Sequence, residues 1–135
     1  YDFYATLGDL TGIEVPVDTD GMSYAPTLLG EGEQAVHDFM YWEFPSYGGQ
    51  VAVRIQNKKN DSGDWKMMRR NLLNEEPVTL EVYNLGDDPE EKVNLAEERP
   101  DIVQRGMEII ENEHTKAEVV RFQMPVLEDE LARLE

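Results

Sequence analysis

The segment from Leu80 to Glu113 constrains the fold more than any other part of the chain. Its first residues include leucine, valine and tyrosine, which suit a half-buried strand. Gly86-Asp87-Asp88-Pro89 follows and predicts a tight turn, because Asp bonds to nearby backbone, proline fixes φ and glycine permits the bend. Pro100 then marks a helix start, since a residue in the first turn has no need of its N–H. The segment therefore predicts a strand, an acidic turn and a long helix.

One face of this predicted helix carries apolar residues at helical spacing. Four residues define it: Val103, Met107, Ile110 and His114. We expect this face to lie across a β-sheet. The position of His114 on the same face favours a packing role over a catalytic one.

Three further strands are predicted upstream, at residues 38–44, 50–56 and 64–70. The second, QVAVRIQ, alternates apolar and polar positions as a strand with one wet face does. Four strands joined by short links indicate an antiparallel meander with one face covered by the helix. We therefore predict an α+β fold of two layers, a four-stranded antiparallel sheet packed against one long C-terminal helix. Four residues should share its core: Val53, Met67, Val82 and Ile110.

Both ends of the chain predict shorter helices. At the N-terminus we expect Asp2 to cap a helix that Gly12 ends, with an extended arm over residues 13–32. Phe3, Leu7 and Leu10 would form the apolar face of that helix. At the C-terminus Leu127, Leu131 and Leu134 favour a short helix. The predicted domains are an N-terminal helix and connection at 1–36, the sheet and helix at 37–124, and an acidic tail at 125–135.

Charge excludes one class of partner. The net charge is -17, and residues 1–36 contain no lysine or arginine. Because nucleic-acid binding needs a basic face, we expect no DNA or RNA partner. No run of eighteen apolar residues is present, so we expect no membrane span. The absence of cysteine excludes disulfides and thiolate metal sites.

No self-contained catalytic site is visible in the sequence. His37 and His114 are the only histidines, and neither has neighbours at metal-ligand spacing. No G-x-S-x-G elbow and no glycine-rich phosphate loop occurs. Glu43 is the one carboxylate within an apolar strand, and it would simply point to solvent in the plainest interpretation.

Several short motifs occur in a characteristic order: FYATLGDLTGIEVP, DGMSYAPTLLG, FMYWEF, GGQVAVR, GDWKMMRR and EVYNLGDDPEEKVNLAEERPDIV, followed by the helix that ends at His114. In this order they resemble the C-terminal part of a type I sulfatase, the arylsulfatase branch of the alkaline-phosphatase-like superfamily. The resemblance covers the chain to about Phe122. Because Tyr1 lies at the start of an apolar stretch, we expect the chain to be a piece of a longer protein.

The resemblance implies a parent enzyme that hydrolyses sulfate esters with a formylglycine nucleophile and a bound calcium ion. The formylglycine arises in a C/S-x-P-x-R motif, which this chain lacks. No catalytic or metal-binding residue is therefore expected here, and the chain alone should be inactive. The resemblance further implies that the N-terminal catalytic domain is a partner, that the substrate is a sulfated small molecule or glycan, and that the parent is periplasmic or secreted.

Three interpretations of the function follow. The chain is a sulfatase subdomain that helps form the wall of the substrate pocket, a structural cap or interaction module, or an unrelated acidic binding protein. For the first, the candidate substrate-binding residues are Trp42, Glu43, Tyr47, Arg54 and Lys66. Each residue type is equally suited to sheet packing or to solvated surface. An exposed apolar face on residues 1–36 also predicts a homodimer of the separated chain.

Overall fold

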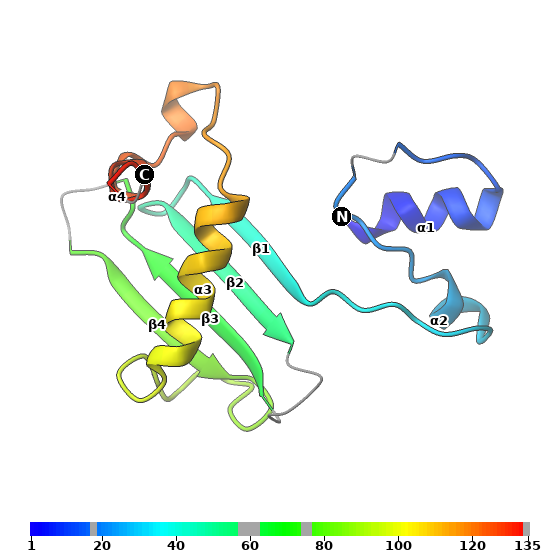
Figure 1. The fold of residues 1–135 in the computed structure, drawn as a ribbon, viewed down its shortest axis with the longest axis horizontal. Coiled ribbons are helices and arrows are strands. Elements are labelled where there is room, and N and C mark those ends of the chain that lie inside the picture. Colours follow the sequence, from blue (N-terminus) through cyan, green and yellow to red (C-terminus); the bar gives the residue numbers. More distant parts are fainter. Residues whose placement is uncertain (17–18, 57–62, 74–76, 134–135) are drawn as a thin grey trace. The chain divides into compact units, whose positions relative to one another are not determined.

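Four antiparallel strands form the centre of the larger part of the chain (Figure 1). They are β1 (Phe39–Phe44), β2 (Gln50–Gln56), β3 (Asp64–Arg70) and β4 (Thr79–Asn84), in the spatial order β1-β2-β3-β4. The register places Tyr41, Val53, Met67 and Val82 in one row across the sheet. The predicted meander is confirmed.

The structure is a computed structural model that describes residues 1–16, 19–56, 63–73 and 77–133. It divides into two compact units, residues Tyr1–His37 and Asp38–Glu135. The first unit contains α1 (Asp2–Thr11) and α2 (Ala25–Leu29), and the second contains the sheet with α3 (Pro100–Glu113), the 3-10 turn η1 (Val120–Phe122) and α4 (Pro125–Leu131). Within the described ranges, no helix is long and apolar enough to cross a membrane.

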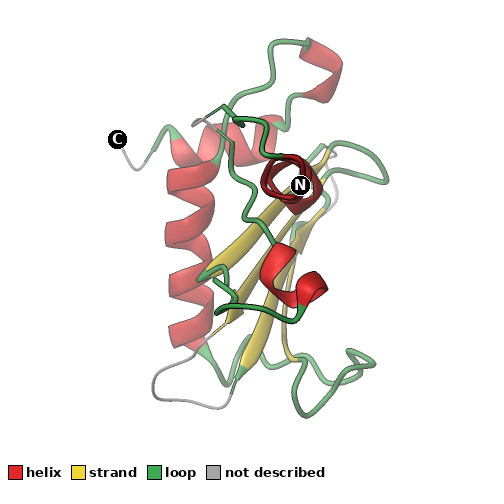
Figure 2. Cartoon of the chain, turned by 90° about the vertical axis from the view of Figure 1, so that its right-hand side faces the viewer, coloured by secondary structure: helices red, strands yellow, loops and turns green. Residues whose placement is uncertain are grey.

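Helix α3 covers one face of the sheet and encloses the hydrophobic core (Figure 2). The predicted core is confirmed, because Val53, Met67, Val82 and Ile110 each have an exposed fraction of 0%. Burial of an aliphatic side chain contributes about 1.5–3 kcal/mol, so these four core residues are a main source of stability. The fold is thus the two-layer α+β arrangement expected from the sequence.

The buried face of α3 is rotated slightly from the predicted one. Its buried residues are Ile102, Gly106, Ile109 and Ile110, whereas Val103 and Met107 lie at the margin. The reason is Gly106, where the helix approaches the sheet so closely that an added Cβ would lie 2.5 Å from Met67 Sδ. The helical spacing of large apolar residues in the sequence cannot identify a glycine as a contact position.

The C-terminal segment completes the core of the second unit. Met124 and Leu127 are fully buried, and the Val126 N–H donates to the Leu72 carbonyl at 3.3 Å. The predicted terminal helix is present as α4, and Leu134 lies outside the described residues. Residues 124–127 are therefore structural in this fold.

The first unit is a helix followed by a folded arm. Gly12 ends α1 in the left-handed conformation, with φ 70°. Two expectations were wrong: residues 13–32 contain the short helix α2, and Asp2 lies inside α1 with Tyr1 as N-cap. The Asp2 carboxylate instead accepts the Met22 N–H at 2.9 Å and contacts His37 Nε2 at 2.8 Å. Asp2 therefore binds the arm through the Met22 N–H and does not cap the helix.

Candidate functional site

The face of the sheet opposite α3, called the open face below, has no covering layer among the described residues of the second unit. The core cluster lies wholly on the α3 side. Alternation along the strands places fourteen residues on the open face: Met40, Trp42, Phe44, Gln50, Ala52, Arg54, Gln56, Asp64, Lys66, Met68, Arg70, Thr79, Glu81 and Tyr83. Trp42, Arg54 and Lys66, three of the predicted site residues, are thereby brought to one surface.

An apolar row crosses the open face. Trp42, Ala52 and Met68 are direct cross-strand neighbours on β1, β2 and β3. Trp42 is 44% exposed and Phe44, on the same edge strand, is 52% exposed. Exposed apolar patches with polar borders mark interaction sites on protein surfaces.

The cations of the open face are each paired with a carboxylate. Arg54 Nε donates to Asp64 Oδ1 at 2.8 Å, and Lys66 Nζ contacts both Glu91 oxygens at 2.7 and 2.8 Å. The pKa of the Arg54 guanidinium is raised chiefly by its hydrogen bond to Asp64. The positive charges of Arg54 and Lys66 are therefore both compensated on the open face.

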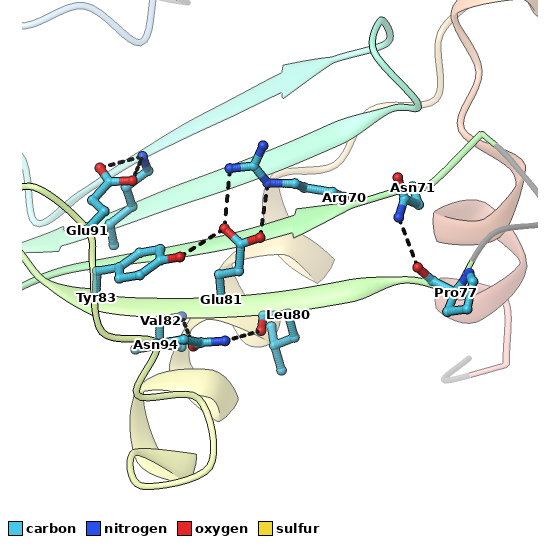
Figure 3. A network of polar contacts seen from close by, with 10 residues as sticks. Arg70, Asn71, Pro77, Leu80, Glu81, Val82, Tyr83, Glu91 and Asn94 are labelled. Atoms are coloured by element: carbon cyan, nitrogen blue, oxygen red, sulfur yellow. Dashed lines mark hydrogen bonds and ion pairs between the residues drawn. The ribbon is translucent and has the colours of Figure 1, made fainter.

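Arg70 repeats this arrangement at the other end of β3 (Figure 3). Its Nε lies 3.1 Å from Glu81 Oε1, and the Tyr83 hydroxyl donates to Glu81 Oε2 at 3.2 Å. Burial first, and then the Glu81 charge and hydrogen bond, raise the pKa of Tyr83. The open face is therefore an apolar row bordered by neutral pairs, a composition that suits a protein surface better than a sulfate ion.

Tyr47 lies in the turn that joins β1 to β2. Its backbone has a φ of 50° and its side chain is 85% exposed. The turn is anchored, since Leu73 N–H donates to the Gly48 carbonyl at 2.8 Å and Leu72 N–H to the Gly49 carbonyl at 3.2 Å. The Tyr47 ring packs against the Phe44 ring with 6.1 Å between centroids. A bulky residue with positive φ on a fixed turn is a strained feature that commonly accompanies function.

Glu43 lies on the opposite side of the sheet from the other strand residues of the predicted site. It accepts hydrogen bonds from the Tyr41 hydroxyl and from His114 Nδ1, the latter at 2.7 Å. The Glu43 side chain is 23% exposed and the His114 side chain 10%. Burial raises the pKa of the Tyr41 phenol, and the charges of Glu43 and Glu113 raise it further. The expectation that Glu43 points to solvent was wrong.

The five predicted site residues therefore do not form one pocket. Trp42, Arg54 and Lys66 share the open face, Tyr47 lies in the adjoining turn, and Glu43 faces α3. In the part of the chain that the structure describes, no three His, Asp or Glu residues are grouped so that they could hold a metal ion.

Family comparison decides the relationship. A sequence model of the C-terminal region of N-sulphoglucosamine sulphohydrolase matches residues 1–116. The chain belongs to this sulfatase C-terminal family. The match includes both units and ends just after α3.

Individual relatives agree with the family. A sulfatase of Formosa agariphila is 31% identical over 110 residues, and a Delta 4,5-hexuronate-2-O-sulfatase of Bacteroides thetaiotaomicron is 33% identical over 97 residues. These matches cover 73% and 72% of this chain but only 19% of each relative. The chain thus corresponds to about a fifth of the length of these curated relatives.

Solved structures share the fold. A 2-O GAG sulfatase aligns over 80% of this chain and 22% of its own, with a TM-score of 0.57 and 25% identity. A second structure, solved with its substrate D-glucosamine-2-N,6-O-disulfate, aligns over 82% of this chain and 22% of its own, with a TM-score of 0.61 and 24% identity. The C-terminal domain of a larger sulfatase is the assignment on which sequence and fold agree.

Sequence reasoning missed the cluster of Tyr41, Glu43 and His114. The available signal was a carboxylate at a core-facing strand position together with a histidine at the end of the helix that covers that face. A buried carboxylate needs a partner. A helix that lies across the sheet can bring His114, at its end, within hydrogen-bonding distance of Glu43.

Proposed function

We propose that the chain docks onto the catalytic domain of its parent sulfatase through the open face and presents the Tyr47 turn to the substrate. One observation carries the proposal: the open face is apolar across three strands, and Arg54, Lys66 and Arg70 on it are paired with carboxylates. Such a surface matches a neutral protein partner that covers the apolar row.

The substrate wall is assigned to the turn between β1 and β2. Tyr47 offers an exposed aromatic ring on an anchored backbone, with Phe44 as its neighbour. Aromatic faces are suited to the apolar faces of sugar rings, since the ring buries much area at small entropic cost. In this proposal Tyr47 contacts the sugar ring, and the sulfate group is held by the parent's other domain.

Sulfated glycans are the proposed substrate class of the parent. The support comes from two similar proteins, a Delta 4,5-hexuronate-2-O-sulfatase and a 2-O GAG sulfatase. The parent would supply the formylglycine and the calcium, and it would act in the periplasm or outside the cell. The separated chain contributes no reacting group, so we expect it to hydrolyse no sulfate ester.

Two substitutions in the full-length parent test the two parts of this proposal. Tyr47→Ala should raise KM for a sulfated disaccharide by up to about tenfold, which corresponds to about 1.4 kcal/mol of lost binding. The melting temperature should not change, because Tyr47 is 85% exposed. Trp42→Ala should lower the free energy of unfolding of the parent by about 3 kcal/mol, as loss of a buried tryptophan does.

The same substitutions in the separated chain are the reference. There Trp42→Ala should cost less than about 1 kcal/mol, since 44% of Trp42 is already exposed to solvent. Val120→Ala is the matched control, because Val120 is exposed and lies outside the open face and the turn. Equal Trp42→Ala costs in parent and chain would contradict docking through the open face.

The alternative is a structural cap without substrate contact. It shares the docking surface and differs only at Tyr47. A KM that stays unchanged in Tyr47→Ala, together with the expected loss of stability in Trp42→Ala, would favour the cap. A homodimer of the separated chain through residues 1–36 is a further proposal, for which the exposed side chains of Phe3, Leu7 and Leu10 are the support.

A further inference from the structure

The outer edge of β1 carries backbone groups without partners. The Gln56 N–H donates to the Asp38 carbonyl at 3.2 Å, which fixes the phase of the β1–β2 ladder. In an antiparallel pair every second residue bonds to its neighbour and the intervening residues point away. The N–H and C=O groups of Phe39, Tyr41 and Glu43 therefore point outward. Within the described ranges, no hydrogen bond reaches these six groups.

At the opposite edge of the sheet, the outward backbone groups of β4 have hydrogen-bond partners (Figure 3). On β4 the outward Val82 N–H donates to Asn94 Oδ1 at 2.9 Å, and the Val82 carbonyl accepts the Leu95 N–H at 2.8 Å. The Leu80 carbonyl accepts Asn94 Nδ2 at 3.0 Å. Residues 94 and 95 thus act as a substitute strand on β4, whereas no described segment of the second unit bonds to the outer edge of β1 in this way.

The composition of β1 leaves this edge competent to pair. Its sequence FMYWEF contains neither lysine nor proline, the residues that commonly block an edge strand. Its one charged side chain, Glu43, is held on the α3 side by Tyr41 and His114. On the open face Trp42 and Phe44 flank the edge, so a pairing strand would also cover two exposed aromatic rings.

We infer that an extended segment of the parent's larger domain pairs with the outer edge of β1 and continues the sheet by one strand. This inference rests on the proposed function, because it takes the parent's catalytic domain as the partner. Two observations select that partner over a second copy. The chain spans only 19% of its curated relatives, so a much larger domain is covalently attached in a protein of that kind. Attachment gives such a segment an effective concentration in the millimolar range, which a separate chain does not reach.

Hydrogen exchange with single-residue resolution tests the pairing. In the separated chain the outward amides of Phe39, Tyr41 and Glu43 should exchange rapidly, and the inward amides of Met40 and Trp42 slowly. In the full-length parent the three outward amides should slow by at least about tenfold, since a strand ladder would now protect them. The Val82 amide is an internal control, because Asn94 already binds it in both proteins.

A pair of substitutions at Phe39 provides a second readout. Phe39→Ala removes only the side chain, whereas Phe39→Pro also removes the outward N–H at the first residue of the strand, where proline is tolerated. The difference in Tm between the two variants should be larger in the parent than in the chain by about 3 °C.

Each outcome decides the inference. Outward amides that exchange equally fast in chain and parent overturn it. In that case, if Trp42→Ala destabilises the parent more than the separated chain, the open-face docking stands and only the edge pairing fails. If Trp42→Ala costs the same in both proteins, both proposals fail. Protection of the outward amides that grows with the concentration of the separated chain would assign the edge to a second copy and overturn the choice of partner.

Discussion

Glu43 connects the edge strand β1 to the end of α3. Its partner there, His114, lies 71 positions away in the sequence. Its carboxylate accepts from Tyr41 and His114, and both side chains of the Glu43–His114 pair are largely buried. Loss of Glu43 leaves the His114 ring and the Tyr41 hydroxyl without this acceptor, and loss of His114 leaves the Glu43 carboxylate with Tyr41 as its one donor. In proteins such a loss costs about 1–3 kcal/mol.

A double-mutant cycle measures this pair. Glu43→Ala and His114→Ala should each lower the free energy of unfolding by about 2 kcal/mol. The double variant should cost less than the sum, because each single variant already breaks the same contact. Glu111→Ala, at an exposed position of α3, is the control. Strictly additive costs in urea unfolding would show that the two side chains do not interact in solution.

Asp2 gives the first unit a dependence on pH. Burial raises the pKa of its carboxyl, but the Met22 N–H and His37 lower it more, so the pKa lies below the ordinary value of 3.8. A lowered pKa means that the carboxylate stabilises the folded arm above pH 3.8 and that this contribution is lost as the pH falls through the lowered pKa.

We therefore expect the arm of the first unit to open at low pH before the second unit unfolds. The Met22 amide, which Asp2 holds at 2.9 Å, reports this opening by NMR. Asp2→Asn should remove the acid-induced change in the Met22 signal. A signal that changes identically with pH in the variant would assign the transition to another group.

Residue types at the open face were predictable from the sequence, but their partners were not. Arg54 and Lys66 were candidates for substrate binding, as residue types equally suited to sheet packing or to solvated surface. The structure pairs Lys66 with Glu91, 25 positions away and beyond β4, at a residue with a φ of 56°. Only the folded turn after β4 brings that carboxylate to the sheet, so periodicity within one strand cannot reveal it.

At the scale of elements the strands were the most predictable part. The predicted bounds of the strands QVAVRIQ and DWKMMRR match those of β2 and β3, and the alternation in QVAVRIQ reflects the burial of one face of that strand. Helix α2 was missed, since its five residues are too few to show a period and Pro26 indicated a turn. Proline at the start of a helix is equally favourable, as α2 demonstrates.

Gly106 sets the distance between α3 and the sheet. Alanine at this position would raise the helix propensity by about 1 kcal/mol. Its Cβ would, however, lie 2.5 Å from Sδ and 2.6 Å from Cε of Met67, which is fully buried in the core and would have to shift. Overpacking of a core costs about 1–3 kcal/mol, so the steric cost exceeds the gain in propensity.

We expect Gly106→Ala to lower the free energy of unfolding by about 1 kcal/mol net, from the difference of these two effects. The companion variant Met67→Ala creates space at the same contact. The double variant should therefore be more stable than the sum of the single costs. A stabilising Gly106→Ala would show that α3 rests farther from β3 than the structure places it.

At the scale of the whole molecule, the chain combines one well-packed unit with one that exposes much of its apolar surface. In the first unit Phe3, Leu7 and Leu10 are exposed, and Leu7 lines an apolar groove with Ile13 and Val15. In the proposed parent these side chains would be covered by the larger domain. The second unit has its own core, and the proposed docking uses its open face and the β1 edge.

The separated chain lacks that larger domain, and its first unit should then associate with a second copy. Burial of a leucine or phenylalanine contributes about 1.5–3 kcal/mol, so three such residues provide a substantial driving force. Residues 1–36 contain seven acidic residues and no lysine or arginine, which opposes association. Salt screens charges that are more than about 10 Å apart at 0.1 M, so the apolar term should prevail at moderate salt.

Sedimentation velocity over a range of concentrations tests this dimer. The full chain should dimerise reversibly, whereas a version that begins at His37 should remain monomeric. Leu7→Glu in the full chain is the matched variant, since it places a charge in the apolar face without removing the unit. If the full chain stays monomeric at high concentration and moderate salt, then neither the exposed face of α1 nor its groove is sufficient for self-association. The apolar residues of the first unit would in that case require the specific shape of the parent's larger domain.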